Sequence, residues 1–205
     1  TECRADLSGK LFVALVGERF DGHDFVEQAR EQGAAALLVD RDVKTMLPTV
    51  RVPSTLGALG ALGAVFENGE GNRVALPVPA VWAEIARMDV TGMLKMPPVF
   101  IACDVTNPLL GQRGAAAVYA PQKGLNAEDF QRMETEGSRM ARLLCAACGR
   151  NGSLTDIAGA GAAGGLGFGL MAGAGARLVP GFDLVSEWLA LEERLARADV
   201  VVTGE

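Results

Sequence analysis

The stretch GKLFVALVGERFDGHDFVEQAREQGAAALLVD, residues 9–40, decides the fold class. The apolar run Leu11–Val16 lies between two glycines and is typical of a buried strand. Asp21 can cap a helix over residues 23–32, which a glycine then ends. A second strand is expected over residues 35–39. This strand–helix–strand order predicts an α/β module with parallel strands.

The pattern continues outward from this stretch. A third strand is expected over residues 49–52, and a helix is expected to begin at Ser54. Its apolar face would hold Leu56, Leu59, Leu62 and Phe66. The polar, glycine-rich segment 67–72 that follows is the clearest break in the chain. We therefore expect a domain over residues 1–76 and a second over residues 77–205.

The sequence of the second expected domain also predicts alternating strands and helices. Strands are expected over residues 99–103 and 199–203, the second of them buried. Asn126 can cap a long helix to residue 148, with acidic residues in its first turn. Further helices are expected after the glycine-rich turn 159–165 and from Asp183. The fold class is therefore α/β: a small N-terminal β/α module, then an incomplete open α/β domain with a largely parallel sheet.

Composition excludes several classes of function. The net charge is −6 and aromatic residues make up 5%, so neither a basic footprint nor a base-stacking surface for nucleic acid is expected. The charge-free stretch 157–176 consists mostly of Gly and Ala, which does not favour a membrane span. With no signal peptide at the start of the sequence, we expect a cytoplasmic protein. Cys145 and Cys148 are expected on one face of a helix, and no metal site is predicted.

Asp104 and Asn107 follow the expected strand at 99–103 and form the first candidate cluster. A carboxylate here could orient a substrate hydroxyl, accept its proton or hold Mg²⁺. Alternatively, both side chains could satisfy backbone groups of their own loop. The spacing leaves both interpretations open.

Two further clusters could bind an anion. Lys123 lies just before the helix that Asn126 caps, where a cation and free N–H groups come together, although a surface lysine is commoner. Residues 158–165 read AGAGAAGG, and their N–H groups could converge on a phosphate ahead of a helix. Close packing explains the same glycines equally well.

Together these clusters resemble the glycerate kinase family. The resemblance rests on FIACDVTNPLLGQRGAAAVYAPQKG and on AGAGAAGGLGFGLMAGAGARLVPGFDLVSEWLALEERLARADVVVTGE, and it runs from about residue 85 to residue 205. It implies ATP- and Mg²⁺-dependent phosphorylation of the organic acid D-glycerate. By matching motifs, Asp104, Asn107 and Lys123 would be catalytic. The substrate and phosphate would be bound by Gly159, Gly161, Gly164, Gly165 and Glu205.

This sequence also departs from the family pattern. The family's Asp-Ser-Phe-Lys segment and its Gly-Gly-Ser-Ala-Thr-Asn-Asp-Gly-Gly motif are absent, and the Gly-Glu-Gly motif stops after Gly204-Glu205. We therefore expect residues 1–205 to phosphorylate glycerate poorly or not at all. Unpaired strand edges would allow such a chain to form a homo-oligomer.

The amino-terminal segment, residues 1–76, resembles the N-terminal domain of the D-alanyl-D-alanine-adding Mur ligase. The likeness rests on TECR at the start and on ERFDGH at residues 18–23. It implies binding of a UDP-linked peptidoglycan precursor through Arg4, Arg19, Asp21 and His23. The ligase's ATP loop is absent, so ligase activity is excluded. A precursor-binding module, or a composite chain with neither activity, are therefore alternatives to the kinase.

Overall fold

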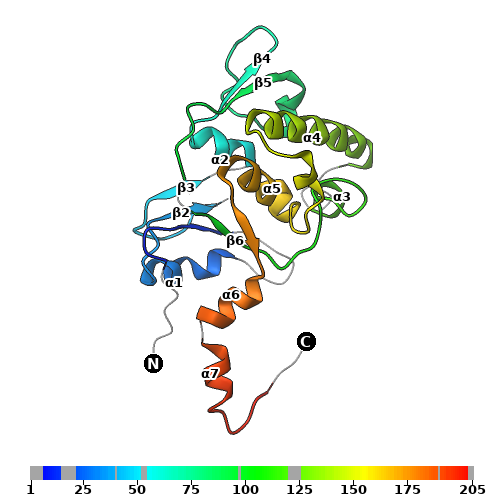
Figure 1. The fold of residues 1–205 in the computed structure, drawn as a ribbon. Coiled ribbons are helices and arrows are strands. Elements are labelled where there is room, and N and C mark those ends of the chain that lie inside the picture. Colours follow the sequence, from blue (N-terminus) through cyan, green and yellow to red (C-terminus); the bar gives the residue numbers. More distant parts are fainter. Residues whose placement is uncertain are drawn as a thin grey trace.

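The computed structural model describes residues 7–14, 22–39, 41–51, 55–96, 98–119, 126–188 and 190–202. Its strands and helices alternate along the chain, and the fold is α/β, as predicted (Figure 1). The layers surround one central helix, α5 (Ala162–Ala174). No helix among the described residues is both long enough and apolar enough to cross a membrane.

The expected parallel strands of the N-terminal part are confirmed. β1 (Leu11–Val13), β2 (Ala36–Val39) and β3 (Thr49–Arg51) form one parallel sheet in that order. The 3-10 turn η1 (Gly22–Phe25) and helix α1 (Val26–Glu31) connect β1 to β2. Apolar side chains of β1, β2 and α1 form a small core, because each strand is too short to bury its residues without the helix.

Helix α2 (Thr55–Ala61) is shorter than the sequence predicted. Gly63 has a φ of +106°, which ends the helix, and a Cβ there would lie 2.5 Å from the carbonyl oxygen of Gly92. Phe66, expected on the helix, lies instead in strand β4 (Val65–Asn68). The prediction that Phe66 lies on this helix was therefore wrong. The helical spacing of apolar residues extends to Phe66 in the sequence, but the helix ends before Gly63.

β4 pairs with β5 (Ile85–Asp89) in an antiparallel ribbon that the sequence did not predict. The two strands lie on opposite sides of residue 76, where a domain boundary is expected. The 3-10 helix η2 (Pro79–Glu84) connects them. The division into two domains stays a prediction, but described residues on both of its sides share this ribbon.

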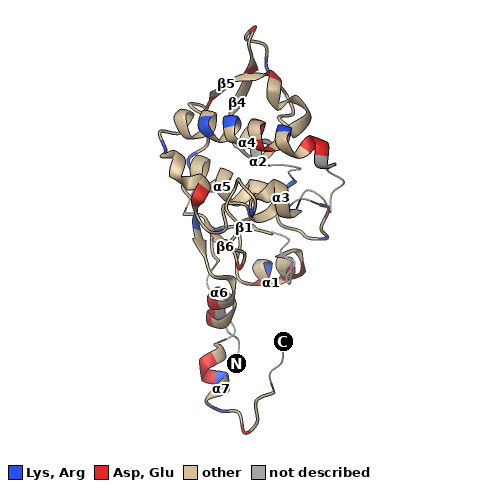
Figure 2. Ribbon diagram, turned by 90° about the vertical axis from the view of Figure 1, so that its right-hand side faces the viewer, with Lys and Arg blue, Asp and Glu red and all other residues tan. Residues whose placement is uncertain are grey.

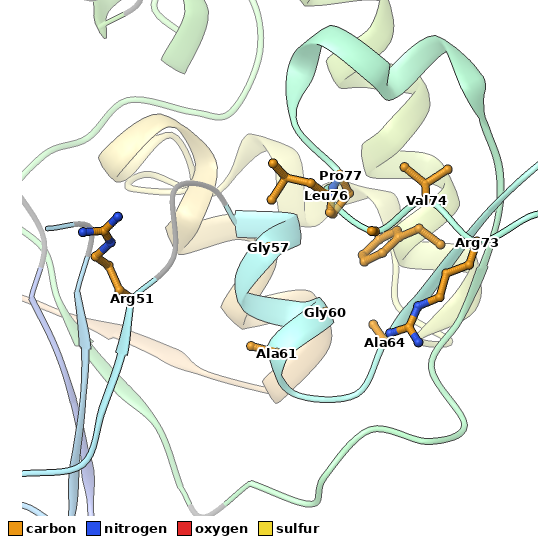
Figure 3. A pocket seen from close by; sticks show the side chains of 11 residues that line it. Arg51, Gly57, Gly60, Ala61, Ala64, Arg73, Val74, Leu76 and Pro77 are labelled. Atoms are coloured by element: carbon orange, nitrogen blue, oxygen red, sulfur yellow. The ribbon is translucent and has the colours of Figure 1, made fainter.

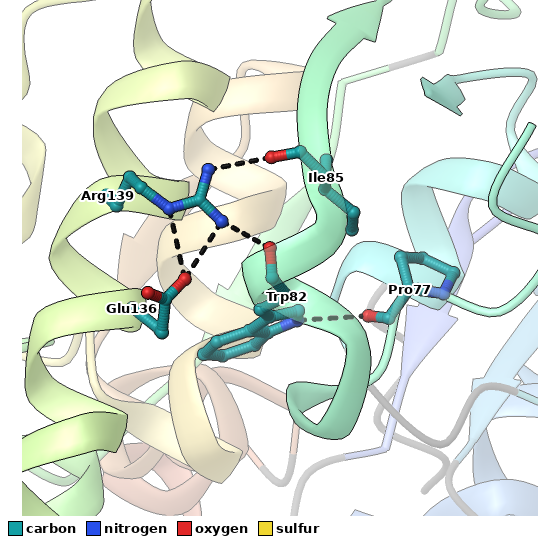
Figure 4. Close-up of polar contacts among 5 residues, drawn as sticks. All are labelled: Pro77, Trp82, Ile85, Glu136 and Arg139. Carbon is teal, nitrogen blue, oxygen red and sulfur yellow. Dashed lines mark hydrogen bonds and ion pairs between the residues drawn. The ribbon is translucent and has the colours of Figure 1, made fainter. Parts of the chain in front are cut away.

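Arg139 fixes the junction between η2 and β5 (Figure 4). Its guanidinium donates to the carbonyl oxygens of Trp82 and Ile85, at 2.7 Å in the second case, and it pairs with Glu136 at 2.8 Å. The indole Nε1 of Trp82 in turn donates to the carbonyl oxygen of Pro77 at 3.1 Å. One half-buried side chain therefore satisfies backbone acceptors that the irregular junction leaves open.

Arg139 belongs to α4 (Ala127–Ala147), the long helix that the sequence predicted. Met140 and Leu144 of its expected apolar face are buried. Asn126 occupies the N-cap position, as expected, but its side chain makes no capping hydrogen bond. Cys145 and Cys148 lie at the end of the helix as free thiols, and burial raises the pKa of both.

The second parallel pair consists of β6 (Phe100–Ala102) and β7 (Arg177–Val179), with α5 running between them in sequence. α5 is apolar on all sides, as expected of a helix that is buried all round. Leu166 and Leu170 pack against β1, β2 and β6, whereas Phe168 and Met171 join a core formed with α2, β4 and α4. The helix therefore belongs to both of the larger hydrophobic clusters.

The remaining helices are short. α3 (Ala115–Tyr119) and the 3-10 helix η4 (Gly152–Asp156) flank α5, whereas α6 (Gly181–Trp188) and α7 (Leu191–Leu195) extend away from the body (Figure 1). A single helix was expected from Asp183 onward. Ala190, with a φ of +44°, separates the two.

The expected buried strand at 199–203 is wrong for the residues that the structure describes. Val200, Val201 and Val202 lie outside any strand and are 77%, 55% and 93% exposed. Three valines in a row favour strand geometry, but a strand also needs a partner. Among the described residues, none pairs with this segment.

Candidate functional site

The loop after β6 and the glycine-rich turn before α5 lie against each other. The carbonyl oxygen of Asn107 accepts hydrogen bonds from the amides of Gly159, at 3.1 Å, and Gly161, at 2.9 Å. The side-chain amide of Asn107 donates to the carbonyl oxygen of Arg113 at 2.9 Å, which closes the loop on itself. Two clusters that are distant in the sequence therefore pack together at the carboxyl end of β6, where Gly159 and Gly161 are buried.

Close approach explains two of the glycines in this turn. A Cβ on Gly161 would lie 2.3 Å from the carbonyl oxygen of Pro108, and one on Gly159 would lie 2.8 Å from Cys103 Sγ. Gly159 also has a φ of +91°. Of the two interpretations that the sequence left open, close packing accounts for both residues.

Three residues near the start of α5 depart from helical geometry. Ala163, Gly164 and Gly165 have φ values of 50°, 73° and 98°, all in the left-handed region. The amides of Gly164 and Gly165 donate to the carbonyl oxygen of Gly161, at 3.1 and 3.2 Å. All four glycines predicted to bind phosphate thus donate their amides to protein carbonyls, and their role in substrate binding stays a prediction.

Asp104 lies in the same loop but its side chain reaches a different element. Its Oδ1 atom accepts hydrogen bonds from the amides of Gly181, at 2.8 Å, and Phe182, at 3.2 Å. These are the first two residues of α6, whose amides have no partner within the helix. The carboxylate therefore caps a helix 77 residues away rather than its own loop.

Sequence reasoning missed Glu134, which supports this loop from α4. Its Oε2 atom accepts a hydrogen bond from the amide of Gly111 at 2.7 Å, where φ is +88°. The two residues are 23 positions apart, and no local pattern links them. Glu134 therefore holds the turn that Asn107 closes.

Cys103 separates β6 from Asp104. Its thiol donates to the carbonyl oxygen of Val105 at 3.4 Å, and burial raises the pKa of the thiol. A thiol with a raised pKa carries little thiolate at neutral pH, so Cys103 serves as a packing residue for the glycine-rich turn.

Several predicted site residues fall outside the described part of the chain. They are Lys123 and Glu205 of the kinase resemblance, and Arg4, Arg19 and Asp21 of the Mur ligase resemblance. His23, the fourth residue of the latter set, is buried in η1. Whether Lys123 joins Asp104 and Gly161 at one site stays a prediction.

Among the described residues, acidic and basic side chains are mixed over the body of the molecule (Figure 2). α4 carries both acidic and basic residues, and α6 and α7 are mainly acidic (Figure 2). Among the described residues, no group of three His, Cys, Asp or Glu side chains could hold a metal ion. Anion recognition would therefore depend on individual side chains and amides.

Comparisons with known proteins show which family the chain belongs to. The sequence model of the glycerate kinase family matches residues 54–205, well over half of the chain. The chain belongs to the glycerate kinase family. The match begins before residue 85, the approximate start of the resemblance in the sequence, and so includes α2 and the β4–β5 ribbon.

Individual relatives support this family assignment. The chain is 37% identical to a glycerate kinase of Bacillus subtilis and 36% identical to glycerate 2-kinase of Escherichia coli, each over 73% of this chain and 39% of the relative. It also matches a crystal structure of a protein assigned as glycerate kinase 2 from Salmonella typhimurium. That structure has a TM-score of 0.66 and 35% identity, over 89% of this chain and 48% of that one.

The first relatives that match are much longer than this chain. It spans 32% to 40% of the length of four glycerate kinases. A second sequence model, described as the Mur ligase family catalytic domain, matches residues 5–70. The amino-terminal segment is therefore similar to Mur ligases, as the sequence indicated, and the two matches overlap at residues 54–70.

Proposed function

We propose that this chain carries a glycerate-binding part of an ATP-dependent glycerate kinase. Two lines of support are its membership of the family and the names of its relatives. The observation that carries the proposal is the junction at Asn107, whose carbonyl oxygen holds both Gly159 and Gly161. That junction joins a strand end to the start of a buried helix, which is where open α/β folds place ligands.

The reaction would join a hydroxyl oxygen of glycerate to the γ-phosphorus of ATP and release ADP. The hydroxyl loses its proton as this bond forms, and the bond between the γ-phosphorus and the bridging oxygen breaks. Asp104 lies at the right end of β6 to accept that proton. Its Oδ1 atom receives the two amides of α6, and its Oδ2 atom lies against Gly181, 2.4 Å from the position of an added Cβ. A substrate hydroxyl would therefore have to reach the carboxylate beside the start of α6.

Positioning would be the second contribution of the loop. Phosphoryl transfer depends on alignment and charge neutralisation more than on covalent chemistry. Glu134 and Asn107 fix the loop through Gly111 and Arg113, so the polar groups of the loop are held in place before a substrate arrives. Lys123 would supply the positive charge for a carboxylate or phosphate.

Mg²⁺ would accompany ATP in such a reaction. Asp104 lies at this end of β6, and among the described residues no group of three His, Cys, Asp or Glu side chains could hold a metal ion. Mg²⁺ often binds proteins through one or two carboxylates together with substrate phosphates. We assign no step to the metal, since the described residues do not form a cradle for it.

Binding of D-glycerate to purified residues 1–205 tests this proposal. We expect saturable binding by isothermal titration, and substantially weaker binding by Asn107→Asp, which removes the amide that donates to the carbonyl oxygen of Arg113 and so releases the loop at the carboxyl end of β6. Asn72→Asp is the matched control, because Asn72 lies in the exposed turn that follows β4. Equal effects of the two substitutions, or no binding by the unaltered chain, would contradict the proposal.

ADP formation is a separate measurement on the same samples. We expect turnover by residues 1–205 to be far below that of a longer relative such as the Bacillus subtilis enzyme, which is assayed in parallel. Comparable rates would contradict this expectation of impaired activity while supporting the kinase assignment. UDP binding by the amino-terminal segment stays a separate prediction, and no contact among the described residues favours it.

A further inference from the structure

A hollow of about 320 Å³ runs along α2, away from the junction at Asn107 (Figure 3). We call it the α2 trough. Gly57, Gly60 and Ala61 line it from the helix, and Val74, Leu76 and Pro77 line it from the segment after β4. Leu59 of the same helix instead packs against Gly173 of α5. The trough and the buried core therefore use different faces of α2.

The floor of the trough is flat because the helix presents no large side chain there. A Cβ built on Gly60 would lie 3.5 Å from Cε2 of Phe66, so the glycine and the edge of the aromatic ring are in contact distance. Phe66 is 2% exposed, so its ring supports α2 from the core and presents almost no surface to the trough. A planar apolar group could lie against such a surface with good contact.

The opposite wall is held in place by its own hydrogen bonds. The amide of Val74 donates to the carbonyl oxygen of Phe66 at 2.7 Å. At the far end of the wall, Pro77 accepts from the indole of Trp82, whose own carbonyl Arg139 binds. A ligand would therefore enter a surface that is already ordered, which lowers the entropy lost on binding.

Two arginines give the trough its charge. Arg51 and Arg73 lie at opposite ends of it, with α2 between them (Figure 3). Among the described residues, the guanidinium of Arg73 has no ion pair, and the lining includes no Asp or Glu. Arg51 pairs with Asp42 at 2.9 Å, but both side chains are largely exposed, so that pair is weak. In a chain with a net charge of −6, this lining favours anions.

We propose that the α2 trough binds an organic anion that joins a planar apolar ring to a phosphate or carboxylate. The ring would lie between the Gly57–Gly60 face of α2 and the apolar side chains of the opposite wall, and the anionic group would pair with Arg73. The volume is within the range of small-molecule sites, and a three-carbon acid would leave most of it empty. Glycerate has no such ring, but a nucleotide has one, and ATP is the phosphoryl donor of the proposed kinase. Binding of nucleotides alone would therefore rest on the kinase function, whereas binding of naphthoate would not.

Isothermal titration of residues 1–205 with UMP, AMP and 2-naphthoate tests the proposal. We expect at least one of these ring-bearing anions to bind with a Kd of about 0.1–1 mM. Inorganic phosphate and D-glycerate should not displace it. Binding of nucleotides alone would identify a nucleotide site, and binding of naphthoate as well would identify a general site for aromatic acids. Absence of binding by all three would overturn the proposal.

Two substitutions locate the ligand. Arg73→Gln removes the unpaired charge and should weaken binding at least tenfold, whereas Arg142→Gln, on the exposed side of α4, should leave it unchanged. Gly60→Leu should fill the trough and abolish binding, with circular dichroism confirming that the chain is folded. Equal affinities of the unaltered chain and Arg73→Gln would overturn the proposal even if Gly60→Leu fails to fold.

Discussion

The glycine-rich turn before α5 and the glycine-bearing helix α2 use the same residue for opposite purposes. In the turn, Gly161 has a backbone carbonyl at the place where a Cβ would be. In α2, a methyl group added to Gly60 would make an ordinary van der Waals contact with Phe66, and Gly60 also lines the α2 trough. A glycine in sequence therefore indicates close packing in one region and available space in the other. Only the neighbours distinguish the two.

Gly161→Ala should cause the largest effect. The added methyl group would lie 2.3 Å from the carbonyl oxygen of Pro108, and neither backbone can move without breaking the hydrogen bonds at Asn107. We expect a loss of about 3 kcal/mol in the free energy of unfolding, measured by urea denaturation. Gly152→Ala is the control, because its Cβ would meet no atom within 4 Å. Similar losses for both variants would remove the distinction between the two regions.

Arg139→Ala should destabilise the wall of the α2 trough. Without the guanidinium, the carbonyl oxygens of Trp82 and Ile85 lose a charged donor in a half-buried position. The expected loss is about 2 kcal/mol in urea denaturation. Arg132→Ala removes a comparable side chain whose only partner among the described residues is the exposed Asp129, and it should cost less than about 0.5 kcal/mol. If Arg132→Ala lowers the free energy of unfolding more than Arg139→Ala does, the hydrogen bonds of Arg139 to the wall are not what stabilises this region.

Asp104→Ala should loosen α6 from the loop that packs against the glycine-rich turn. The carboxylate caps the amides of Gly181 and Phe182, and the loss of a helix cap typically costs about 1 kcal/mol. Faster proteolysis within residues 181–188 would report this loss. Asp156→Ala, at an exposed aspartate in η4, should leave the cleavage rate unchanged. Unchanged cleavage of Asp104→Ala would show that other contacts hold α6.

Gly60→Ala should have the smallest effect and the opposite sign. The methyl group would make an ordinary contact with Phe66, and alanine has a higher helix propensity than glycine. We expect an increase of about 0.5–1 kcal/mol in the free energy of unfolding and a higher Tm. A decrease would mean that α2 is packed as tightly as the turn.

Local patterns predicted the elements whose causes are local. The apolar runs of β1 and β2 and the amphipathic spacing of α4 were sufficient to place these elements. The same reasoning failed at Phe66 and at Val200–Val202. In both places the apolar residues fit the expected element, but the turn at Gly63 and the absence of a described partner strand decided the outcome.

The candidate site shows the same limit. The family resemblance grouped Asn107 with the glycine-rich turn, and hydrogen bonds at Gly159 and Gly161 join the two segments in the structure. Their roles in binding stay a prediction. It could not predict that Asp104 would cap α6 or that Glu134 would hold Gly111. Both contacts join residues far apart in the chain, and neither side chain carries a signal of its distant partner.

The position of α5 has a consequence for how the chain unfolds. Leu170 packs with residues of β1, β2 and β6, and Phe168 packs with α2, β4 and α4, so both of the cores that this helix completes combine residues from before and after residue 76. Removing either side would strip that helix of half its neighbours. The chain should therefore lose structure in a single cooperative step, and a cut after residue 76 should leave two fragments that cannot fold separately.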